Sequence, residues 1–211
     1  MGIETVLLLA AAVTAVFAIF GEYRPTRTLV YVFKPLTTGL IIVLALLGAG
    51  TPAVYKWLIV AGLLFCLGGD VFLMLPARYF LYGLVSFLIG HLLYIAAFVA
   101  DAGLTFSGWL LPLLLFGGGV YALLHAHLGK MRGPVIVYIT AILLMAWQAI
   151  GRWALLDGTG PLLAAVGACL FVLSDATLAL DRFRQKFHAA RVIVLTTYWA
   201  AQACIALSVW G

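Results

Sequence analysis

The sequence predicts an all-α, polytopic membrane protein with eight transmembrane helices in a single domain covering residues 1–211. Of the 211 residues, 66% are hydrophobic and 9% are charged, and the mean hydropathy is +1.20. These values lie outside the range of soluble globular proteins. The apolar runs are about 18 to 24 residues long, which as helices span a hydrocarbon core of about 30 Å. Helices are expected because isolated strands would leave backbone groups unpaired in lipid.

The expected spans follow one another along nearly the whole chain: 3–20, 29–48, 55–75, 79–100, 106–126, 134–150, 160–180 and 189–210. No positive charge precedes the first run, so we expect a retained helix and not a signal peptide. The three cysteines, Cys66, Cys169 and Cys204, fall within spans and are expected to be small buried apolar residues. The connections are short, the longest being about ten residues, so any chemistry must lie among the helices.

The basic residues predict the orientation of the helices. Nine of the twelve fall in the four connections on one side: Arg24, Arg27, Arg78, Lys130, Arg132, Arg182, Arg184, Lys186 and Arg191. Lys56 and Arg152 fall on the other side, and Lys34 lies within a span. The positive-inside rule therefore places the nine in the cytoplasm and both termini outside. Four tryptophans are expected at the outer boundary: Trp57, Trp109, Trp153 and Trp210. The net charge of +5 follows from this topology and gives no support for nucleic-acid binding.

Two aspartates interrupt apolar spans in similar surroundings, Asp70 in "GGDVFLML" and Asp175 in "LSDATLAL". They are 105 residues apart, half the chain length. Gly62 and Gly167 also align at this offset. The match predicts an internal repeat, 1–105 and 106–211, of two four-helix halves in parallel orientation with an axis along the membrane normal. Coincidence in a sequence rich in Leu and Gly is the alternative.

Counting residues from the cytoplasmic boundary of each span places three ionisable groups at a similar depth in the membrane, in one layer. Each aspartate is expected about 10–12 Å inside the cytoplasmic boundary, and Lys34 reaches a similar level on the second span. Such groups cost at least about 2.5–3.5 kcal/mol on insertion, so they usually face the bundle interior and indicate function. The structural alternative is an ion pair between Lys34 and one aspartate, which leaves the other carboxylate unpaired.

Further polar side chains lie deeper in the bundle. His91 and Tyr94 share a face of the fourth span, and Tyr198 and Gln202 share a face of the eighth. Each is a candidate site residue or an interhelical hydrogen-bonding group. The remaining polar residues are weaker candidates: Thr37 and Thr38, expected to bond to their own helix backbone; Tyr138 and Gln148; and the interfacial His125 and His127.

Motifs for several familiar chemistries are absent, because the sequence contains no HExxH, CxxC, GxSxG or P-loop pattern. No metal and no cofactor is therefore expected. Two carboxyl groups in an apolar site favour one protonated and one ionised form, which gives an acid and a base. Such a pair suits cleavage through an oxocarbenium-like cation.

Five segments occur together and in order: "FKPLTT", "GGDVFLML", "GLVSFLIGHLLY", "LSDATLAL" and "TYWAAQ". On these segments the chain resembles the YhhN-type lysoplasmalogenase family over nearly its whole length. The resemblance implies hydrolysis of the vinyl ether bond of lysoplasmalogens to a fatty aldehyde and glycerophosphoethanolamine or glycerophosphocholine, without a metal or cofactor. The family's paired aspartates map onto Asp70 and Asp175. Its other site residues, which bind substrate or tune an aspartate, map onto Lys34, His91, Tyr94, Tyr198 and Gln202.

Vinyl ethers hydrolyse by protonation at carbon, so an acid is required. We expect one aspartate to supply the proton while the other stabilises the cation and activates water, with Asp175 favoured as the acid. Lys34 is expected to attract the phosphate or to tune an aspartate. The expected partners are a lysophospholipid substrate and membrane lipids, with the mouth of the site toward the cytoplasm. A proton-coupled lipid or small-molecule transporter is one alternative, and a ceramidase-like membrane lipid hydrolase, which would bind zinc, is another.

Overall fold

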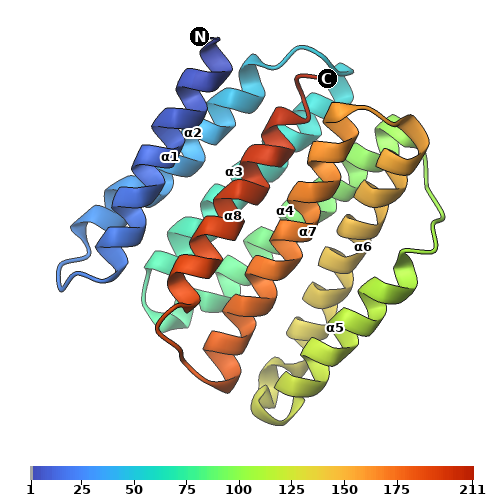
Figure 1. Ribbon diagram of the computed structural model, residues 1–211. Coiled ribbons are helices and arrows are strands. Elements are labelled where there is room, and N and C mark those ends of the chain that lie inside the picture. Colours follow the sequence, from blue (N-terminus) through green and yellow to red (C-terminus); the bar gives the residue numbers. More distant parts are fainter. Residues whose placement is uncertain (1) are drawn as a thin grey trace.

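The computed structural model describes residues 2–211, and this part of the chain contains eight helices long and apolar enough to cross a membrane (Figure 1). Their α-helical parts are α1 (Ile3–Glu22), α2 (Thr28–Leu47), α3 (Ala53–Met74), α4 (Phe80–Ala102), α5 (Leu110–Leu124), α6 (Arg132–Leu156), α7 (Thr159–Ala179) and α8 (Ala190–Leu207), and a further helical turn extends the fifth to His127. Residues 2–211 contain no strand. The predicted fold class is therefore confirmed.

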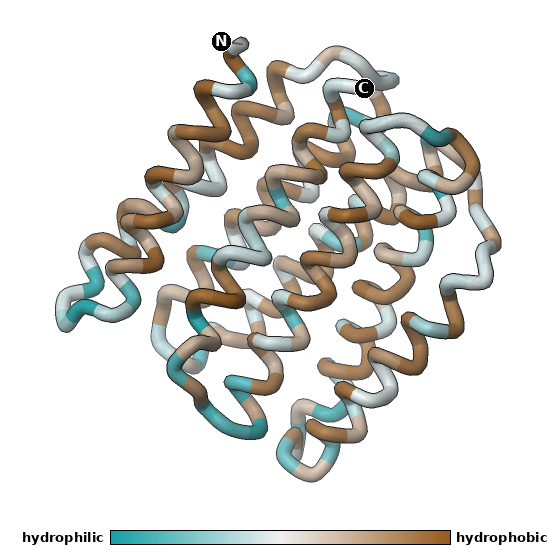
Figure 2. The backbone as a smooth tube through the Cα atoms, in the orientation of Figure 1, coloured by the Kyte–Doolittle hydropathy of each residue, from teal (hydrophilic) through white to brown (hydrophobic). Residues whose placement is uncertain are grey.

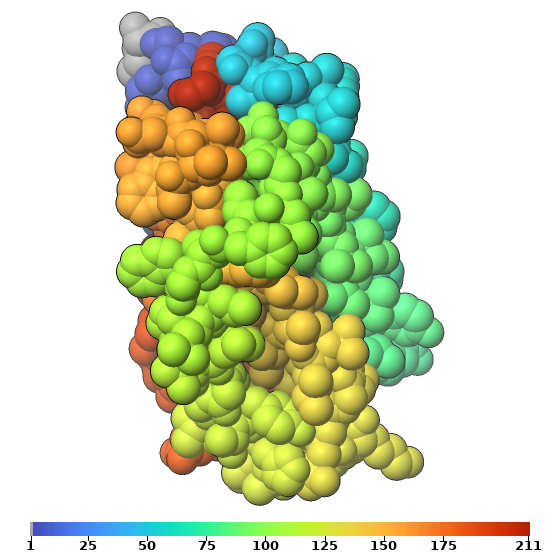
Figure 3. Space-filling view, turned by 90° about the vertical axis from the view of Figure 1, so that its right-hand side faces the viewer, coloured from blue at the N-terminus to red at the C-terminus, as the bar shows by residue number. Residues whose placement is uncertain are grey.

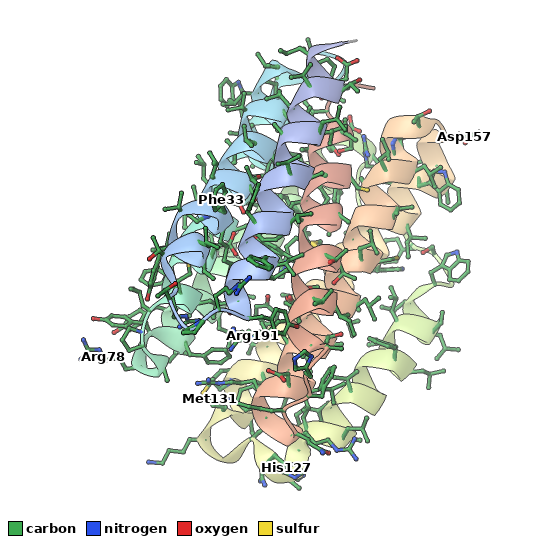
Figure 4. All side chains as sticks on the ribbon, turned by 60° about the vertical axis from the view of Figure 1, so that its left-hand side comes forward. Phe33, Arg78, His127, Met131, Asp157 and Arg191 are labelled. Carbon is green, nitrogen blue, oxygen red and sulfur yellow. The ribbon has the colours of Figure 1, made fainter. Side chains whose placement is uncertain are left out.

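The helices alternate in direction, so both ends of the chain lie at one end of the bundle (Figure 1). The turns after α1, α3, α5 and α7 lie at the opposite end. In Figure 4, Arg78, His127 and Arg191 lie toward this opposite end, whereas Asp157 lies at the other. The nine basic residues grouped by the sequence all lie in or beside these four turns. We refer to this end of the bundle as the basic end.

Burial is uneven among the helices. In α1 and α5 few residues are buried, and in α5 these are Gly117 and Leu124. By contrast, most of the length of α6 is buried between its neighbours. Figure 3 shows α5 on the outside of the bundle over the lower part of α6. In Figure 2 hydrophobic residues run along all the helices, and many of the large ones are exposed on the surface of the bundle, as expected where lipid replaces water as the solvent.

Small residues allow neighbouring helices to pack closely. A Cβ atom added at Gly90 in α4 would lie 2.9 Å from the Cys66 sulfur, and one at Gly167 in α7 would lie 2.8 Å from the Ala201 carbonyl oxygen. Gly62 in α3 likewise packs against the Tyr94 ring of α4. Such contacts are typical of membrane helix pairs. Because Gly62 and Gly167 align in the predicted repeat and both lie at close helix contacts, we propose that the two four-helix halves are related.

The fifth helix is shorter than the predicted span 106–126, because residues Gly103–Trp109 are not helical and run along the outside of α6 (Figure 1). Non-helical backbone inside a membrane protein needs hydrogen-bond partners. Gln148 of α6 supplies them: its side-chain oxygen accepts from the Thr105 N–H at 3.1 Å, and its side-chain nitrogen donates to the Thr105 carbonyl at 3.0 Å. Gln148 therefore has a structural role that the sequence did not indicate.

The sixth helix is longer than the predicted span 134–150, because Arg152 lies inside it and not in a connection. The Arg152 side chain is 2% exposed, and its Nε donates to the Asp101 carboxylate of α4 at 2.7 Å. Its guanidinium also lies over the Tyr55 ring, 4.4 Å from the centroid. A buried charge is tolerated when it is paired and hydrogen-bonded, so the helix continues through a residue whose charge suggested a boundary.

Replacing Gln148 by Leu is expected to lower the free energy of unfolding by about 1–3 kcal/mol, because the Thr105 backbone groups lose their partners in an apolar setting. Thermal unfolding of the purified protein in detergent measures the change. Gln185→Leu, at an exposed position beyond α7, is the matched control and should unfold as the parent protein does. Equal unfolding temperatures for the two variants would contradict the assigned role of Gln148.

Candidate active site

Asp70 in α3 is the centre of a buried polar network. Its carboxylate is 1% exposed and accepts from the Thr38 hydroxyl at 2.7 Å and the Tyr198 hydroxyl at 2.8 Å. The Lys34 ammonium lies 3.4 Å from its second oxygen. Lys34 and Thr38 are one helical turn apart on α2, so both reach the same face. The ion pair that the sequence left as a structural alternative is therefore present, and it involves Asp70.

Asp175 in α7 has a different environment. The Tyr138 hydroxyl of α6 donates to one of its oxygens in a short hydrogen bond. Among the described residues no lysine, arginine or histidine lies within ion-pair distance of it. Its side chain is partly exposed and faces a cavity between the helices. One aspartate thus has a cation as its partner and the other has only a neutral hydroxyl.

The cavity that Asp175 faces, called the chamber below, lies between α4, α5, α6 and α7, beside the end of α3. Among its lining residues only Asp175 and Tyr138 carry polar side-chain atoms. The apolar walls include Phe80, Phe87, Val120, Ile142, Val172 and Phe183. The chamber therefore suits a hydrocarbon chain and offers it one carboxyl group.

A second cavity, called the vestibule below, lies at the basic end. Its charged lining consists of Arg27, Lys34, Arg182, Lys186 and Arg191 together with Glu22 and Asp181. The vestibule and the chamber share three wall residues, Leu73, Phe80 and Leu178. The two cavities are therefore adjacent, one basic and one apolar.

Asp70 lines neither cavity and is linked to both through its partners. Lys34 forms part of the vestibule wall. On the other side, the Tyr198 ring packs edge-on against Phe87, which lines the chamber, with 5.8 Å between centroids. No hydrogen bond joins the two carboxyl groups in residues 2–211. The predicted layer of ionisable groups is therefore divided into two separate networks.

The remaining predicted site residues lie deeper between the helices. The Tyr94 hydroxyl donates to the Gln202 side-chain oxygen at 2.8 Å, joining α4 to α8. His91 is fully buried between the Tyr138 and Phe171 rings, at centroid distances of 5.3 and 4.8 Å. Neither ring nitrogen of His91 has a hydrogen-bond partner within the described part of the chain. His91 therefore contacts the tyrosine that holds Asp175. Tyr94 is paired with the Gln202 oxygen, and the Gln202 side-chain nitrogen has no hydrogen-bond partner among the described residues.

Some expectations for individual residues were wrong. Thr37 bonds to its own helix backbone as expected, at 2.8 Å from the Phe33 carbonyl, but Thr38 donates to Asp70 instead. The spacing of Thr38 four residues after Lys34 was the available signal. Tyr138, a weak candidate by sequence, is the partner of Asp175. Cys66 is buried, but Cys169 is exposed on the surface of its helix, and all three cysteines are free.

Comparison with known proteins adds an independent line of support. The sequence model of the YhhN family matches residues 29–209. The chain is 31% identical over 204 residues to the membrane protein YhhN of Escherichia coli O157:H7, covering 96% of this chain and 97% of that protein. It is 38% identical over 156 residues to lysoplasmalogenase TMEM86A of Bos taurus, covering 71% of this chain and 64% of that protein. It is 40% identical over 144 residues to lysoplasmalogenase TMEM86B of Sus scrofa, covering 67% and 58%. No solved structure matches the chain.

Proposed function

This chain belongs to the YhhN family, and we propose that it is a lysoplasmalogenase, a hydrolase of the vinyl ether bond of alkenyl glycerophosphoethanolamine and glycerophosphocholine. The products are a fatty aldehyde and the glycerophosphodiester. The observation that carries the proposal is the carboxyl group of Asp175, which stands without a cation in an apolar chamber beside a basic vestibule. The relatives named lysoplasmalogenase support it, although the chain matches only 64% and 58% of their lengths.

The two cavities suit the two ends of such a lipid. A long alkenyl chain fits the apolar walls of the chamber, and the anionic phosphate fits the basic vestibule. The vinyl ether bond lies between chain and head group in the substrate. It would therefore lie near the shared wall of Leu73, Phe80 and Leu178, within reach of Asp175.

Asp175 is the proton donor in this proposal. A carboxyl group that faces an apolar cavity with no cation beside it is more stable in its neutral form. The proton passes from the carboxyl oxygen to the ether's outer vinyl carbon, and the electron pair of the C=C bond forms the new C–H bond. The positive charge that results is shared between the inner carbon and the ether oxygen as an oxocarbenium ion. Tyr138, which donates to the other carboxyl oxygen, stabilises the carboxylate left behind.

Water completes the reaction. Its oxygen bonds to the cationic carbon, and one of its protons passes to the Asp175 carboxylate, which restores the acid. The resulting hemiacetal breaks its bond to the glycerol oxygen, which takes the hemiacetal proton. The fatty aldehyde and the free glycerol hydroxyl leave. The balance is one water consumed for each bond broken, with no oxidant or cofactor.

Asp70 acts in this proposal as a positioning residue. Lys34 at 3.4 Å favours its ionised form, and the carboxylate in turn fixes the Tyr198 hydroxyl behind the chamber wall and Lys34 in the vestibule. This assigns Lys34 to Asp70 in preference to the phosphate. His91, Tyr94 and Gln202 support the site from outside the two cavities in this proposal: His91 packs against Tyr138, and the Tyr94–Gln202 hydrogen bond joins α4 to α8.

We propose that the basic end faces the cytoplasm and that both termini lie outside, as the positive-inside rule predicts. Because the vestibule opens at the basic end, the head group would then enter from the cytoplasmic side.

The test gives the purified protein alkenyl and acyl lysophospholipids side by side and measures aldehyde and fatty acid. Aldehyde from the alkenyl lipid, with no fatty acid from the acyl lipid, is the expected result. Release of fatty acid would contradict the assigned bond. In proteoliposomes, lipid movement driven by a proton gradient with no product formed would instead support the transporter.

A further inference from the structure

We propose that Arg182 and Lys186, in the connection between α7 and α8, form a phosphate-binding site for the head group of a single-chain phosphodiester lipid. The inference deepens the proposed function by assigning the residues that hold the substrate, and it rests on that function for the substrate's identity. Four observations carry it: the ion pairs of the vestibule, the turn that ends α7, the contact between Arg182 and Phe80, and the sequence spacing between Arg182 and Asp175.

Ion pairs engage three of the five cations that line the vestibule. Lys34 is paired with Asp70 at 3.4 Å. The Glu22 carboxylate contacts both Arg27, at 3.7 Å, and Arg191.

Arg182 and Lys186 have no carboxylate within ion-pair distance among the described residues. The nearby Asp181 accepts from the Phe187 backbone N–H at 3.1 Å and so holds the connection in shape. An anion in the vestibule would therefore meet two cations that form no ion pair within the described part of the chain.

The turn that ends α7 directs neighbouring side chains to different cavities. Leu180–Arg184 form a π-helical turn, with the Gln185 N–H donating to the Leu180 carbonyl at 3.0 Å. Such turns are rare and frequently occur at functional sites. Here Arg182 lines the vestibule and the next residue, Phe183, lines the chamber. The turn therefore places a cation and an apolar side chain on the two sides of the junction.

The Arg182 guanidinium is held at that junction by Phe80. It lies over the Phe80 ring, 4.7 Å from the centroid, as in a cation–π contact. Phe80 belongs to the walls of both cavities. A guanidinium can form two parallel hydrogen bonds to a phosphate. The contact with Phe80 therefore places such a group at the junction of the two cavities, and Lys186 adds a second charge to the vestibule.

The spacing between Arg182 and Asp175 matches the substrate. The two residues are seven positions apart, which corresponds to about 10 Å along a helix. In the substrate, seven bonds join the phosphorus to the carbon that takes the proton, an extended length of about 9 Å. A phosphate at Arg182 would thus bring the vinyl ether to the level of Asp175.

The kinetic test compares charge removal inside and outside the vestibule. Arg182→Gln is expected to raise KM for the alkenyl lysophospholipid about tenfold or more, with a much smaller effect on kcat, and Lys186→Gln less strongly. The KM of Arg182→Lys should lie between those of the wild-type protein and Arg182→Gln, because lysine keeps the charge and loses the two-bond geometry. Arg184→Gln, in the same turn, and Lys130→Gln, at the same end of the bundle, line neither cavity and should leave KM unchanged.

A binding test does not depend on turnover. The wild-type protein should bind a saturated 1-O-alkyl glycerophosphoethanolamine, which has no vinyl bond, about tenfold or more tightly than 1-O-alkylglycerol, which has no phosphate. The ratio of the affinities for the two lipids should approach one in the Arg182→Gln/Lys186→Gln double variant. Equal binding of both lipids by the wild-type protein, or the same loss in Arg184→Gln, would overturn the proposal.

Inorganic phosphate as a competitor distinguishes a lipid site from a free-phosphate site. We expect it to displace the alkyl lysophospholipid only weakly, because it gains nothing from the chamber. Displacement as effective as that by the lipid itself would refute the lipid assignment. Phosphate-dependent binding of the alkyl lysophospholipid, together with no aldehyde from the alkenyl lysophospholipid, would contradict the proposed function and leave the phosphate site standing.

Discussion

Replacement of Asp175 by Asn is expected to lower turnover of the alkenyl lysophospholipid by about 10²- to 10⁴-fold, the range for loss of a general acid. The amide has nearly the same shape and its oxygen still accepts from Tyr138, but it has no acidic proton to give to the vinyl carbon. The chamber should therefore keep its form and its affinity for substrate. Aldehyde formation at saturating substrate measures kcat, and thermal unfolding in detergent shows whether the variant is folded.

The matched control is Asp157→Asn, the same substitution in the exposed connection at the opposite end of the bundle (Figure 4). Asp157 has a φ of +53°, which Asn also adopts readily, so this variant should keep full activity. A folded Asp175→Asn protein with turnover close to the wild type would show that the acid lies elsewhere. It would also remove the main reason for assigning the chamber to the reacting bond.

The fold was largely predictable because span length and hydropathy report directly on the lipid environment. The two main errors concern where the fifth helix begins and where the sixth ends. Both have one physical cause, which is that a side chain from another part of the chain pairs with a polar group that the sequence alone leaves unpaired. Gln148 satisfies the non-helical backbone at Thr105, so the fifth helix starts late. Asp101 neutralises Arg152, so the sixth helix does not end at its charge. Neither pairing is visible in a single sequence, because each joins residues more than forty positions apart.

The sequence predicted the residues of the candidate site better than the contacts between them. Asp70, Asp175 and Lys34 were identifiable because charge in an apolar span is costly. Their partners depend on how the helices pack. Thr38 and Tyr138 therefore appeared as weak candidates, and the division into two networks was not foreseen. Arg182 was interpreted only as a marker of orientation, because nothing in the sequence indicates a π-helical turn or a stacking contact.

The Lys34–Asp70 pair gives the other large expected effect. Asp70→Asn keeps acceptors for Thr38 and Tyr198 but leaves the buried Lys34 without its counter-charge, and Lys34→Met leaves the buried carboxylate alone. Each single variant should lose about 3–5 kcal/mol of stability, the usual cost of an uncompensated buried charge. The double variant Lys34→Met/Asp70→Asn should be more stable than either single variant, since no buried charge remains. Unfolding of all four proteins in detergent gives the coupling energy.

Turnover separates a structural pair from a functional one. If Asp70 acts by fixing Tyr198 and Lys34 through its charge, kcat should stay low in the double variant although stability returns. The same reasoning predicts that the phosphate-dependent part of binding, held by Arg182 and Lys186, changes little in the double variant. Recovery of kcat together with stability would reduce Asp70 to a structural partner of Lys34 and leave Asp175 as the only carboxyl group in the chemistry. Additive losses in stability would contradict the buried pair itself.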